Sequence, residues 1–312
     1  MTESQPIVVT NNVSHRYGER LALDGVSLSV AAGEAFALLG PNGSGKTTLF
    51  RILSTLLPPQ DGRVTIDGLD VARQPADVRT RIGVVFQSPS LDKQLTAAEN
   101  LRHHGHLFGL RGAALRARTD QLLSRVNLAD RAAERVGGFS GGMRRRVEIA
   151  KALLTRPRVL LMDEPSTGLD PAARQDVWNL LREARQRERV TVLLTTHLMD
   201  EADDCDRVAF MNEGKLVACD TPAALKGRVG GDVMTIGSSN PTALATALRE
   251  KLSIDTKVDG RFVRLERSSA HELVPAVVAA APGLVDSVSV AKPTLEDVFL
   301  HLTGRRFEAD RA

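Results

Sequence analysis

The sequence predicts an α/β fold: a mostly parallel core sheet, an antiparallel β subdomain, a helical subdomain and a small C-terminal α+β domain. Mainly apolar runs at residues 82–86, 159–162 and 189–194 have the pattern of strands buried on both faces of a parallel sheet. Helix-forming stretches lie between them, as such a sheet requires. The pattern then changes in a glycine-containing stretch, so we expect the first domain to cover residues 1–228 and the second 229–312.

The composition is that of an ordinary globular protein. The 312 residues are 42% apolar and 25% charged, which suits about two domains. A net charge of only +3 gives no basis for a nucleic-acid-binding surface, so no nucleic acid partner is expected. The two cysteines, Cys205 and Cys219, fit a reducing compartment. We see no signal peptide and no apolar run near the roughly 20 residues that cross a bilayer, so any membrane role is expected to come from a partner.

Short β-rich runs near the N-terminus predict an antiparallel sheet. They lie at residues 7–9, 13–17, 26–30 and 64–66, and turn residues separate them. The only tyrosine, Tyr17, ends one of these runs and precedes the most informative motif in the sequence. Its ring has the chemistry to stack on a nucleotide base, although a lone aromatic residue here is more often a half-buried strand residue.

That motif is a glycine-rich loop between an apolar run, residues 35–39, and a helix-forming stretch, residues 49–53. The spacing G-x-x-x-x-G-K-[ST] in this context is typical of a phosphate-binding P-loop, because a helix N-terminus offers unpaired N–H groups and a positive dipole end. Lys46 would supply a cation for the β- and γ-phosphates, and the Thr47 hydroxyl suits Mg²⁺. The candidate nucleotide-binding residues are Gly40, Pro41, Asn42, Gly43, Ser44, Gly45, Lys46, Thr47 and Thr48.

Polar side chains follow three of the predicted core strands: Gln87, the pair Asp163 and Glu164, and His197. Ligands of parallel sheets gather at the carboxyl ends of strands, so we expect these residues to lie around one nucleotide site. Asp163 would lie near Mg²⁺, and Glu164 would polarise the attacking water. His197 would hydrogen-bond the γ-phosphate.

Helical sequence fills the interval between these strands. A capping box at Thr96 to Glu99 begins the helical subdomain, which we place at about residues 89–135. We expect Gly105 to interrupt the helix. The histidines at 103, 104 and 106 lack a cysteine or acidic pair at ligand spacing, so the sequence favours a solvated or partner-facing helix surface over a metal site.

A second glycine pair precedes the next helix. Ser140 is a natural N-cap, and Gly141 and Gly142 let backbone N–H groups approach an anion. Alone, this pattern is typical of an ordinary cap. The three arginines at 144–146 are expected to form a solvated face, because the chain as a whole is nearly neutral.

Six ordered motifs over roughly residues 7–225 resemble those of the ATP-binding subunits of ABC transporters: GPNGSGKT, Gln87, FSGGM, LLMDEP, STGLD and TTH. The resemblance implies ATP and Mg²⁺ as cofactors, and a homodimer or paired subunit that closes head to tail on two ATP molecules. It implies an integral membrane permease as partner, contacted by the helical subdomain at the cytoplasmic face. The implied roles are Lys46, Gln87, Glu164 and His197 in catalysis, Thr47, Gln87 and Asp163 at the metal, Ser140, Gly141 and Gly142 at the partner's nucleotide, and Asp170 in communication across the dimer.

The C-terminal segment at residues 292–300, KPTLEDVFL, is similar to the tails of ABC-2-type exporter ATPases of the daunorubicin/doxorubicin-resistance kind. This favours an ATPase that powers export of a hydrophobic small molecule, with a lipid or polysaccharide exporter as the alternative. A soluble ABC ATPase of translation or DNA maintenance is disfavoured by the single P-loop and the lack of sustained heptads. Phe139 and Met143 depart from the family's commoner Leu and Gln.

Overall fold

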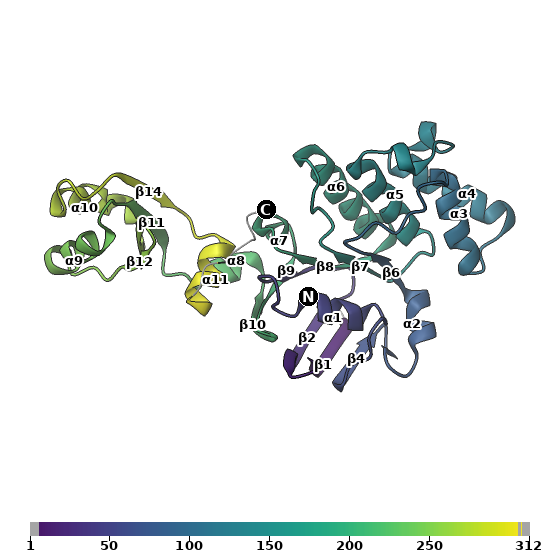
Figure 1. Ribbon diagram of the computed structural model, residues 1–312, viewed down its shortest axis with the longest axis horizontal. Helices are drawn as coiled ribbons and strands as arrows, with labels where there is room; N and C mark the ends of the chain where they lie inside the picture. Colours follow the sequence, from purple (N-terminus) through teal and green to yellow (C-terminus); the bar gives the residue numbers. More distant parts are fainter. Residues whose placement is uncertain (1–5, 305–306, 308–312) are drawn as a thin grey trace. The chain divides into compact units, whose positions relative to one another are not determined.

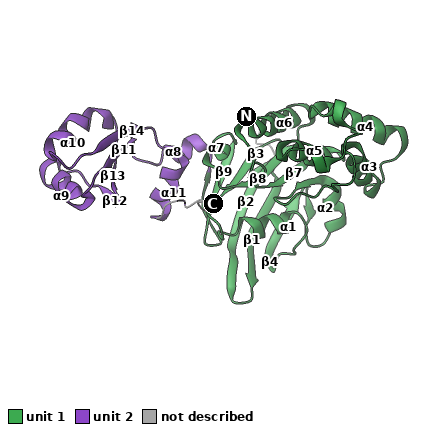
Figure 2. Ribbon diagram, turned by 45° about the horizontal axis from the view of Figure 1, so that its top comes forward, with its two compact units in different colours: residues 1–219, 308–312 green, residues 220–307 purple. Residues whose placement is uncertain are grey.

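The computed structural model describes residues 6–304 and 307, and it divides into two compact units (Figures 1 and 2). The first unit contains residues up to Cys219 and the second runs from Asp220 to Phe307. Residues 1–5, which belong to the stretch where a signal peptide was sought, and the last residues of the expected second domain lie outside the described part. No helix among the described residues is both long and apolar enough to span a membrane.

An antiparallel sheet of order β2-β1-β4-β5 begins the first unit. Its strands are β1 (Pro6–Tyr17), β2 (Arg20–Ala31), β4 (Asp61–Ile66) and β5 (Leu69–Asp70). The sequence predicted separate short strands at 7–9 and 13–17, whereas β1 is continuous. Asn12 takes a left-handed φ of 50°, and the register with β2 shifts between Thr10 and Val13. Asparagine tolerates this conformation, so a bulge absorbs the polar interruption without ending the strand.

The core sheet has the order β10-β9-β3-β8-β7-β6. Its strands are β3 (Ala35–Leu39), β6 (Ile82–Val85), β7 (Val159–Asp163), β8 (Thr191–Thr196), β9 (Arg207–Asn212) and β10 (Lys215–Asp220). The pairs β6–β7, β7–β8, β3–β8 and β3–β9 are parallel. Every residue of β3, β7 and β8 is buried, which explains their unbroken apolar sequence. The predicted mostly parallel core is confirmed, and its carboxyl ends carry the polar residues singled out above.

Helices cover both faces of this sheet, with α5 and α6 on one side and α1 on the side of the antiparallel sheet (Figure 1). The helices of the first unit are α1 (Lys46–Leu53), α2 (Pro75–Arg81), α3 (Ala97–Leu107), α4 (Gly112–Arg125), α5 (Gly141–Leu153), α6 (Pro171–Glu188) and α7 (Met199–Asp203). The capping box that begins α3 is present as expected, with Thr96 and Glu99 bonded reciprocally.

The expectation that Gly105 interrupts the helix is wrong. Gly105 lies inside α3 and is buried, and a Cβ placed there would lie 2.4 Å from Cδ1 of Leu115 on α4. The glycine therefore permits close packing of the two helices, which is a tertiary reason that the local sequence does not reveal. The described residues include no cluster of His, Cys, Asp or Glu that could hold a metal ion.

The second unit is a sheet of order β12-β13-β11-β14 with helices around it. Its elements are α8 (Pro222–Lys226), β11 (Asp232–Gly237), α9 (Pro241–Leu252), β12 (Lys257–Asp259), β13 (Phe262–Arg267), α10 (Val274–Ala280), β14 (Ser287–Ala291) and α11 (Leu295–Thr303). The unit begins at Asp220, earlier than the boundary expected after residue 228, because α8 packs against α11.

Candidate active site

The glycine-rich loop connects β3 to α1, as its sequence predicts. Gly45 is the N-cap of α1 with a φ of 104°, a conformation that side-chain-bearing residues rarely adopt. A Cβ at this position would also lie 2.6 Å from the carbonyl oxygen of Ala22. Both constraints require glycine here. The first N–H groups of α1 are unpaired within the helix at its N-terminus, beside the loop, where an anion would be favoured.

Lys46 is the first residue of α1, and only 4% of it is exposed. Its Nζ donates hydrogen bonds to the carbonyl oxygens of Gly40 at 2.6 Å and Pro41 at 3.0 Å. Burial lowers the pKa of the ammonium, while the nearby carboxylates of Glu164 and Asp163 raise it in part. A buried cation in a glycine loop, near two carboxylates, suits an anionic ligand that arrives with its own Mg²⁺.

A small pocket of about 150 Å³ opens beside this lysine. Its lining residues are Tyr17, Arg20, Ala22, Asn42, Gly43, Gly45, Lys46, Thr47, Thr48 and Glu164. Tyr17 is 44% exposed and makes an edge contact with His15 at 4.8 Å between ring centroids, so its ring is available at the mouth of the loop. Ser44 Oγ is buried and has no hydrogen-bond partner within the described part of the chain. These features fit a phosphate-bearing nucleotide.

Arg20 was not singled out from the sequence. It lines this pocket from β2, and its Nη2 lies 3.4 Å from the carbonyl oxygen of Gly43. Arg20 is the first residue of an antiparallel strand and lies some twenty residues before the loop. Nothing in the neighbouring sequence therefore indicates that it lines the nucleotide pocket. The antiparallel sheet brings it there.

Asp163 ends β7 and is buried. Desolvation raises the pKa of its carboxyl group, and a 2.5 Å hydrogen bond from the Thr195 hydroxyl to Oδ1 opposes that shift. Thr195 lies opposite Asp163 on the neighbouring strand β8. Thr195 was not predicted as a site residue, although the TTH motif contains it.

Glu164 is held by its backbone and by its side chain. Its φ is 46°, and its N–H donates to both the carbonyl oxygen and the hydroxyl oxygen of Thr195, at 3.1 and 3.0 Å. Its Oε2 accepts from Gln87 Nε2 at 3.0 Å and from Thr167 Oγ1 at 3.1 Å, and it lies 3.4 Å from His197 Nδ1. The structure therefore brings Gln87, Glu164 and His197 together at adjacent strand ends. A carboxylate so fixed has the position of a base for water at the γ-phosphate.

Ser140 and Asp170 both act as helix caps and do not line the pocket beside Lys46. Ser140 Oγ accepts from the N–H of Met143 at 3.2 Å at the start of α5, and Asp170 Oδ1 accepts from the N–H of Ala173 at 2.9 Å at the start of α6. Ser140 and Asp170 are exposed. Gly142 has no room for a Cβ, which would lie 2.7 Å from Cβ of Ala173.

Comparison with known proteins decides the family. The model of the ABC transporter family matches residues 23–167. The daunorubicin resistance ATP-binding protein DrrA3 of Streptomyces coeruleorubidus is 41% identical over 95% of this chain and 96% of its own length. This chain belongs to the ABC transporter ATP-binding proteins. The linearmycin resistance ATP-binding protein LnrL of Bacillus subtilis is 35% identical over 94% of this chain and 97% of its own length, and a Nod factor export ATP-binding protein I of Paraburkholderia xenovorans is 40% identical over 96% and 97%.

Solved structures of ABC cassettes share the fold of this ABC ATPase. The ATP-binding cassette MJ0796, dimeric in a post-hydrolysis state with ADP and Pi, has 31% identity and a TM-score of 0.62, and it covers 69% of this chain and 98% of its own. The cassette cbiO1 of Clostridium perfringens has 29% identity and a TM-score of 0.67 over 71% of this chain and 91% of its own. The predicted fold class, the ATPase activity, and the dimer and permease partners are confirmed, and the soluble alternative is not favoured.

The expected solvated face at the three arginines of this ABC ATPase is wrong for Arg145, which is only 7% exposed. Its Nη1 donates to the carbonyl oxygen of Phe86 at 2.7 Å and to Glu148 Oε2 at 3.1 Å, and its Nη2 donates to the carbonyl oxygen of Gln87 at 3.3 Å. Glu148 Oε1 in turn accepts from the N–H of Ser90 at 2.6 Å. The helix α5 therefore holds both sides of the turn that carries Gln87, and these partners lie almost sixty residues away in sequence.

Proposed function

We propose that this ABC ATPase hydrolyses Mg²⁺-bound ATP to power export of a hydrophobic small molecule through a separate permease at the cytoplasmic face of a membrane. One observation carries the catalytic part of the proposal. The carboxylate of Glu164 is fixed by Gln87, Thr167 and His197 in a site that it shares with the buried cation of Lys46. Base and cation thus line the same pocket, as hydrolysis of a bound phosphate group requires.

The chemistry is phosphoryl transfer to water, in which positioning and charge stabilisation supply most of the rate. In this proposal Glu164 orients the water and accepts its proton. Lys46 and His197 stabilise the negative charge that develops on the transferred group. Ser140, Gly141 and Gly142 complete the site of the opposite subunit with the N-terminus of α5, and Asp170 lies beside that contact.

Mg²⁺ would neutralise phosphate oxygens when bound. The residues that would hold it are Thr47, Asp163 and Gln87, and all three offer oxygen ligands of the kind that this cation prefers. The hydrogen bond from the Thr195 hydroxyl to Oδ1 supports the assignment for Asp163, because it fixes the carboxylate while leaving Oδ2 for the metal. Gln87 has its amide nitrogen committed to Glu164, which leaves its amide oxygen for the metal.

The contact with the permease is assigned to the helical subdomain at about residues 89–135. Its helix α3 exposes Leu107, which is 83% exposed, and Phe108 follows at 38%. Exposed apolar side chains at a helix end suit a docking site for an apolar partner. Gln87 would link this contact to the nucleotide, since its loop leads directly into the subdomain. Within the chain, residues 1–228 would provide the ATP-binding domain and 229–312 an accessory one.

The cargo class rests on the relatives. Two of them are named for daunorubicin resistance and one for linearmycin resistance, which favours export of a drug or antibiotic. Other relatives are named for Nod factor export. For this reason a different cargo for this chain, such as a lipid or polysaccharide, is the second candidate.

The deciding experiment is purification of the tagged chain from gently solubilised membranes, identification of the co-purifying permease, and reconstitution of the pair in vesicles. We expect the pair to move daunorubicin in an ATP-dependent manner, and the matched pair with Glu164→Gln to bind ATP without transport. A pair that hydrolyses ATP but moves lipid instead of the drug would refute the cargo assignment alone. Retention of ribosomes or DNA-bound proteins with no membrane partner would refute the export function.

A further inference from the structure

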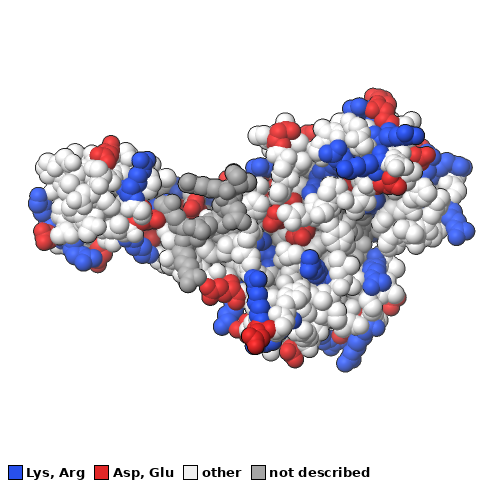
Figure 3. All heavy atoms as spheres, viewed as in Figure 1, with Lys and Arg blue, Asp and Glu red and all other residues white. Residues whose placement is uncertain are grey.

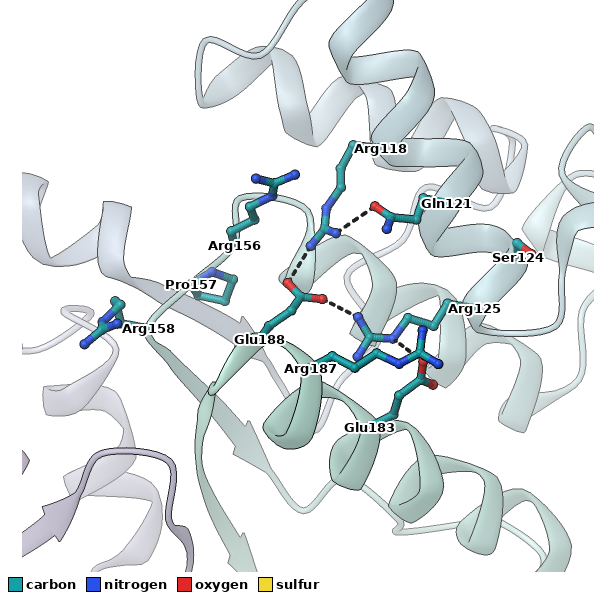
Figure 4. A pocket seen from close by; sticks show the side chains of 10 residues that line it. All are labelled: Arg118, Gln121, Ser124, Arg125, Arg156, Pro157, Arg158, Glu183, Arg187 and Glu188. Carbon is teal, nitrogen blue, oxygen red and sulfur yellow. Dashed lines mark hydrogen bonds and ion pairs between the residues drawn. The ribbon is translucent and has the colours of Figure 1, made fainter. Parts of the chain in front are cut away.

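A pocket of about 730 Å³ lies away from the nucleotide site, between α4, α6 and the segment that leads into β7 (Figure 4). Its lining residues are Arg118, Gln121, Ser124, Arg125, Arg156, Pro157, Arg158, Glu183, Arg187 and Glu188. Pro157 and Arg158 precede β7, whereas Asp163 ends it. A strand of this length spans roughly 16 Å, so the pocket belongs to the opposite edge of the core sheet from the catalytic residues.

The charge of this arginine pocket is strongly one-sided. Five arginines and two glutamates line it, a formal excess of three positive charges, and of these arginines Arg158 also lies 3.8 Å from Asp67 Oδ1 outside the lining. Pro157 is the one apolar residue among the ten, so the walls offer little to an apolar ligand such as a hydrophobic cargo. Basic side chains also gather over the helices α4 to α6 on the face drawn in Figure 3.

The ion pairs within the pocket do not satisfy this charge. Arg118 and Arg125 share the carboxylate of Glu188, which lies between them in Figure 4, and Nε of Arg125 lies 3.4 Å from Oε1 of Glu183, the carboxylate that also pairs with Arg187. Burial alone would raise the pKa of Glu188, yet the two guanidinium groups hold it below its ordinary value. Arg125 is only 9% exposed, and its Nη2 has no hydrogen-bond partner among the described residues.

Arg156 is a further cation available to a ligand. It is exposed at the pocket, and its guanidinium has no hydrogen bond or ion pair within the described part of the chain. Arg187 is paired only with Glu183 on its own helix and is 74% exposed, so this pair holds the guanidinium weakly. Guanidinium groups recognise phosphate oxygens through paired hydrogen bonds, better than the ammonium of lysine does.

We propose that the arginine pocket binds a small soluble polyphosphate anion, and that the bound anion bridges the helical subdomain to the core of the ATPase. Arg118 and Arg125 belong to α4, Arg187 belongs to α6, and Arg156 precedes β7. An anion held by all three segments stabilises their arrangement by mass action, by an amount that rises with the logarithm of its concentration relative to its dissociation constant. The pocket is therefore a second phosphate site, separate from the nucleotide site, and the inference holds whether or not the proposed cargo is right.

The test uses the full chain with Lys46→Ala, which removes the main phosphate ligand of the P-loop, and titrates it with sodium tripolyphosphate by calorimetry in low salt without Mg²⁺. We expect one anion per chain. Arg156→Ala with Arg187→Ala is expected to weaken binding by at least about tenfold, because two charge-assisted contacts are lost. The control Arg116→Ala removes an exposed arginine of the same helix α4 outside the pocket, and it is expected to leave the affinity within about twofold.

Three outcomes would overturn the proposal: no binding to the Lys46→Ala chain, equal affinity in the pocket variant, or an equal loss in Arg116→Ala, which would indicate nonspecific attraction. Arg156 and Arg187 are exposed, so their substitution is compatible with folding, and unchanged melting temperatures of the ligand-free variants check this. Vesicles of phosphatidylglycerol provide the second arm. Vesicle binding that tripolyphosphate fails to displace would assign the pocket to a lipid headgroup and overturn the soluble ligand.

Discussion

The side-chain amide of Gln87 donates a 3.0 Å hydrogen bond to Oε2 of Glu164, across 77 positions of sequence. The bond joins the loop after β6 to the residue after β7, and these two strands are parallel neighbours. It orients the carboxylate expected to act on water, and it connects that carboxylate to the loop that enters the helical subdomain. A displacement of the loop therefore changes the position of the base as well as that of Gln87.

Substitution of Lys46 tests the phosphate-binding role. Lys46→Ala is expected to reduce ATP hydrolysis by at least about 100-fold, because the buried cation that stabilises the transferred phosphate is lost. Phosphate release by the purified permease complex measures this. Lys257→Ala, at an exposed position on β12 of the second unit, is the control and should retain wild-type turnover. Undiminished hydrolysis by Lys46→Ala would exclude the role.

Glu164→Gln separates binding from chemistry. The amide is nearly the same size as the carboxylate but cannot accept a proton, so hydrolysis is expected to fall by roughly 100- to 1,000-fold while ATP still binds. The variant should accumulate as an ATP-bound dimer on gel filtration, with bound nucleotide measured in the same fractions. A monomer that retains ATP would contradict the head-to-tail site completed by Ser140.

Thr195→Val tests the hydrogen bonds that Thr195 makes with Asp163 and Glu164. The substitution keeps the shape of the side chain but removes its hydrogen bonds to Oδ1 of Asp163 and to the N–H of Glu164. A buried carboxylate left unsatisfied costs about 1–3 kcal/mol, so the free energy of unfolding should fall by that amount in urea titrations, together with hydrolysis. The control Thr65→Val on β4 should change neither. An equal loss in the control would remove the special role of Thr195.

Arg145→Gln is expected to lower the free energy of unfolding by roughly 3 kcal/mol, because it leaves the buried carboxylate of Glu148 without its cation. The double variant with Glu148→Gln should recover part of that stability. Both variants should keep ATP binding but lose turnover, since Gln87 is no longer fixed through its carbonyl group. Full turnover in the stabilised double variant would limit Arg145 to a purely structural role.

The acid sensitivity of the helical subdomain follows from His104. Burial, with a smaller contribution from Lys151, lowers its pKa from 6.5 to about 4. Above pH 6.5 the side chain is neutral in both states, so its contribution to stability is complete there. Between 6.5 and about 4 the unfolded chain takes up a proton that the folded chain does not, so the free energy of unfolding decreases as the pH falls.

His104→Gln should make this decrease shallower in denaturant titrations at a series of pH values. His103→Gln, at an exposed position on the same helix, is the control and should retain the wild-type dependence. Identical pH profiles for His104→Gln and the wild type would rule out the effect.

The sequence was sufficient where local chemistry decides the structure. The P-loop at Gly45 and Lys46 and the capping box at Thr96 each depend on residues within a few positions, and the structure contains them as expected. The gathering of Gln87, Glu164 and His197 also followed from sequence, because three buried strands ending in polar residues imply one edge of a parallel sheet.

The sequence was insufficient where a partner is distant. An arginine in a basic helical stretch such as 144–146 is expected to be solvated. Arg145 is buried because the fold brings the carbonyl groups of Phe86 and Gln87 to its guanidinium, which donates hydrogen bonds to both. Gly105 likewise resembles a helix breaker until Leu115 is seen to occupy the space beside it. In both cases the neighbouring sequence suggests a different local role, and the observed structure results from a contact with residues that are not adjacent in sequence.

The close approach of Gly142 to Ala173 has a consequence for how two subunits meet. With no space for even one methyl group between the first turns of α5 and α6, neither helix end can slide along the other. Ser140 and Asp170, which cap these two ends, are therefore carried by helix turns that pack directly against each other. In the proposed head-to-tail dimer, an incoming subunit would therefore meet helix ends whose spacing is already set within the monomer.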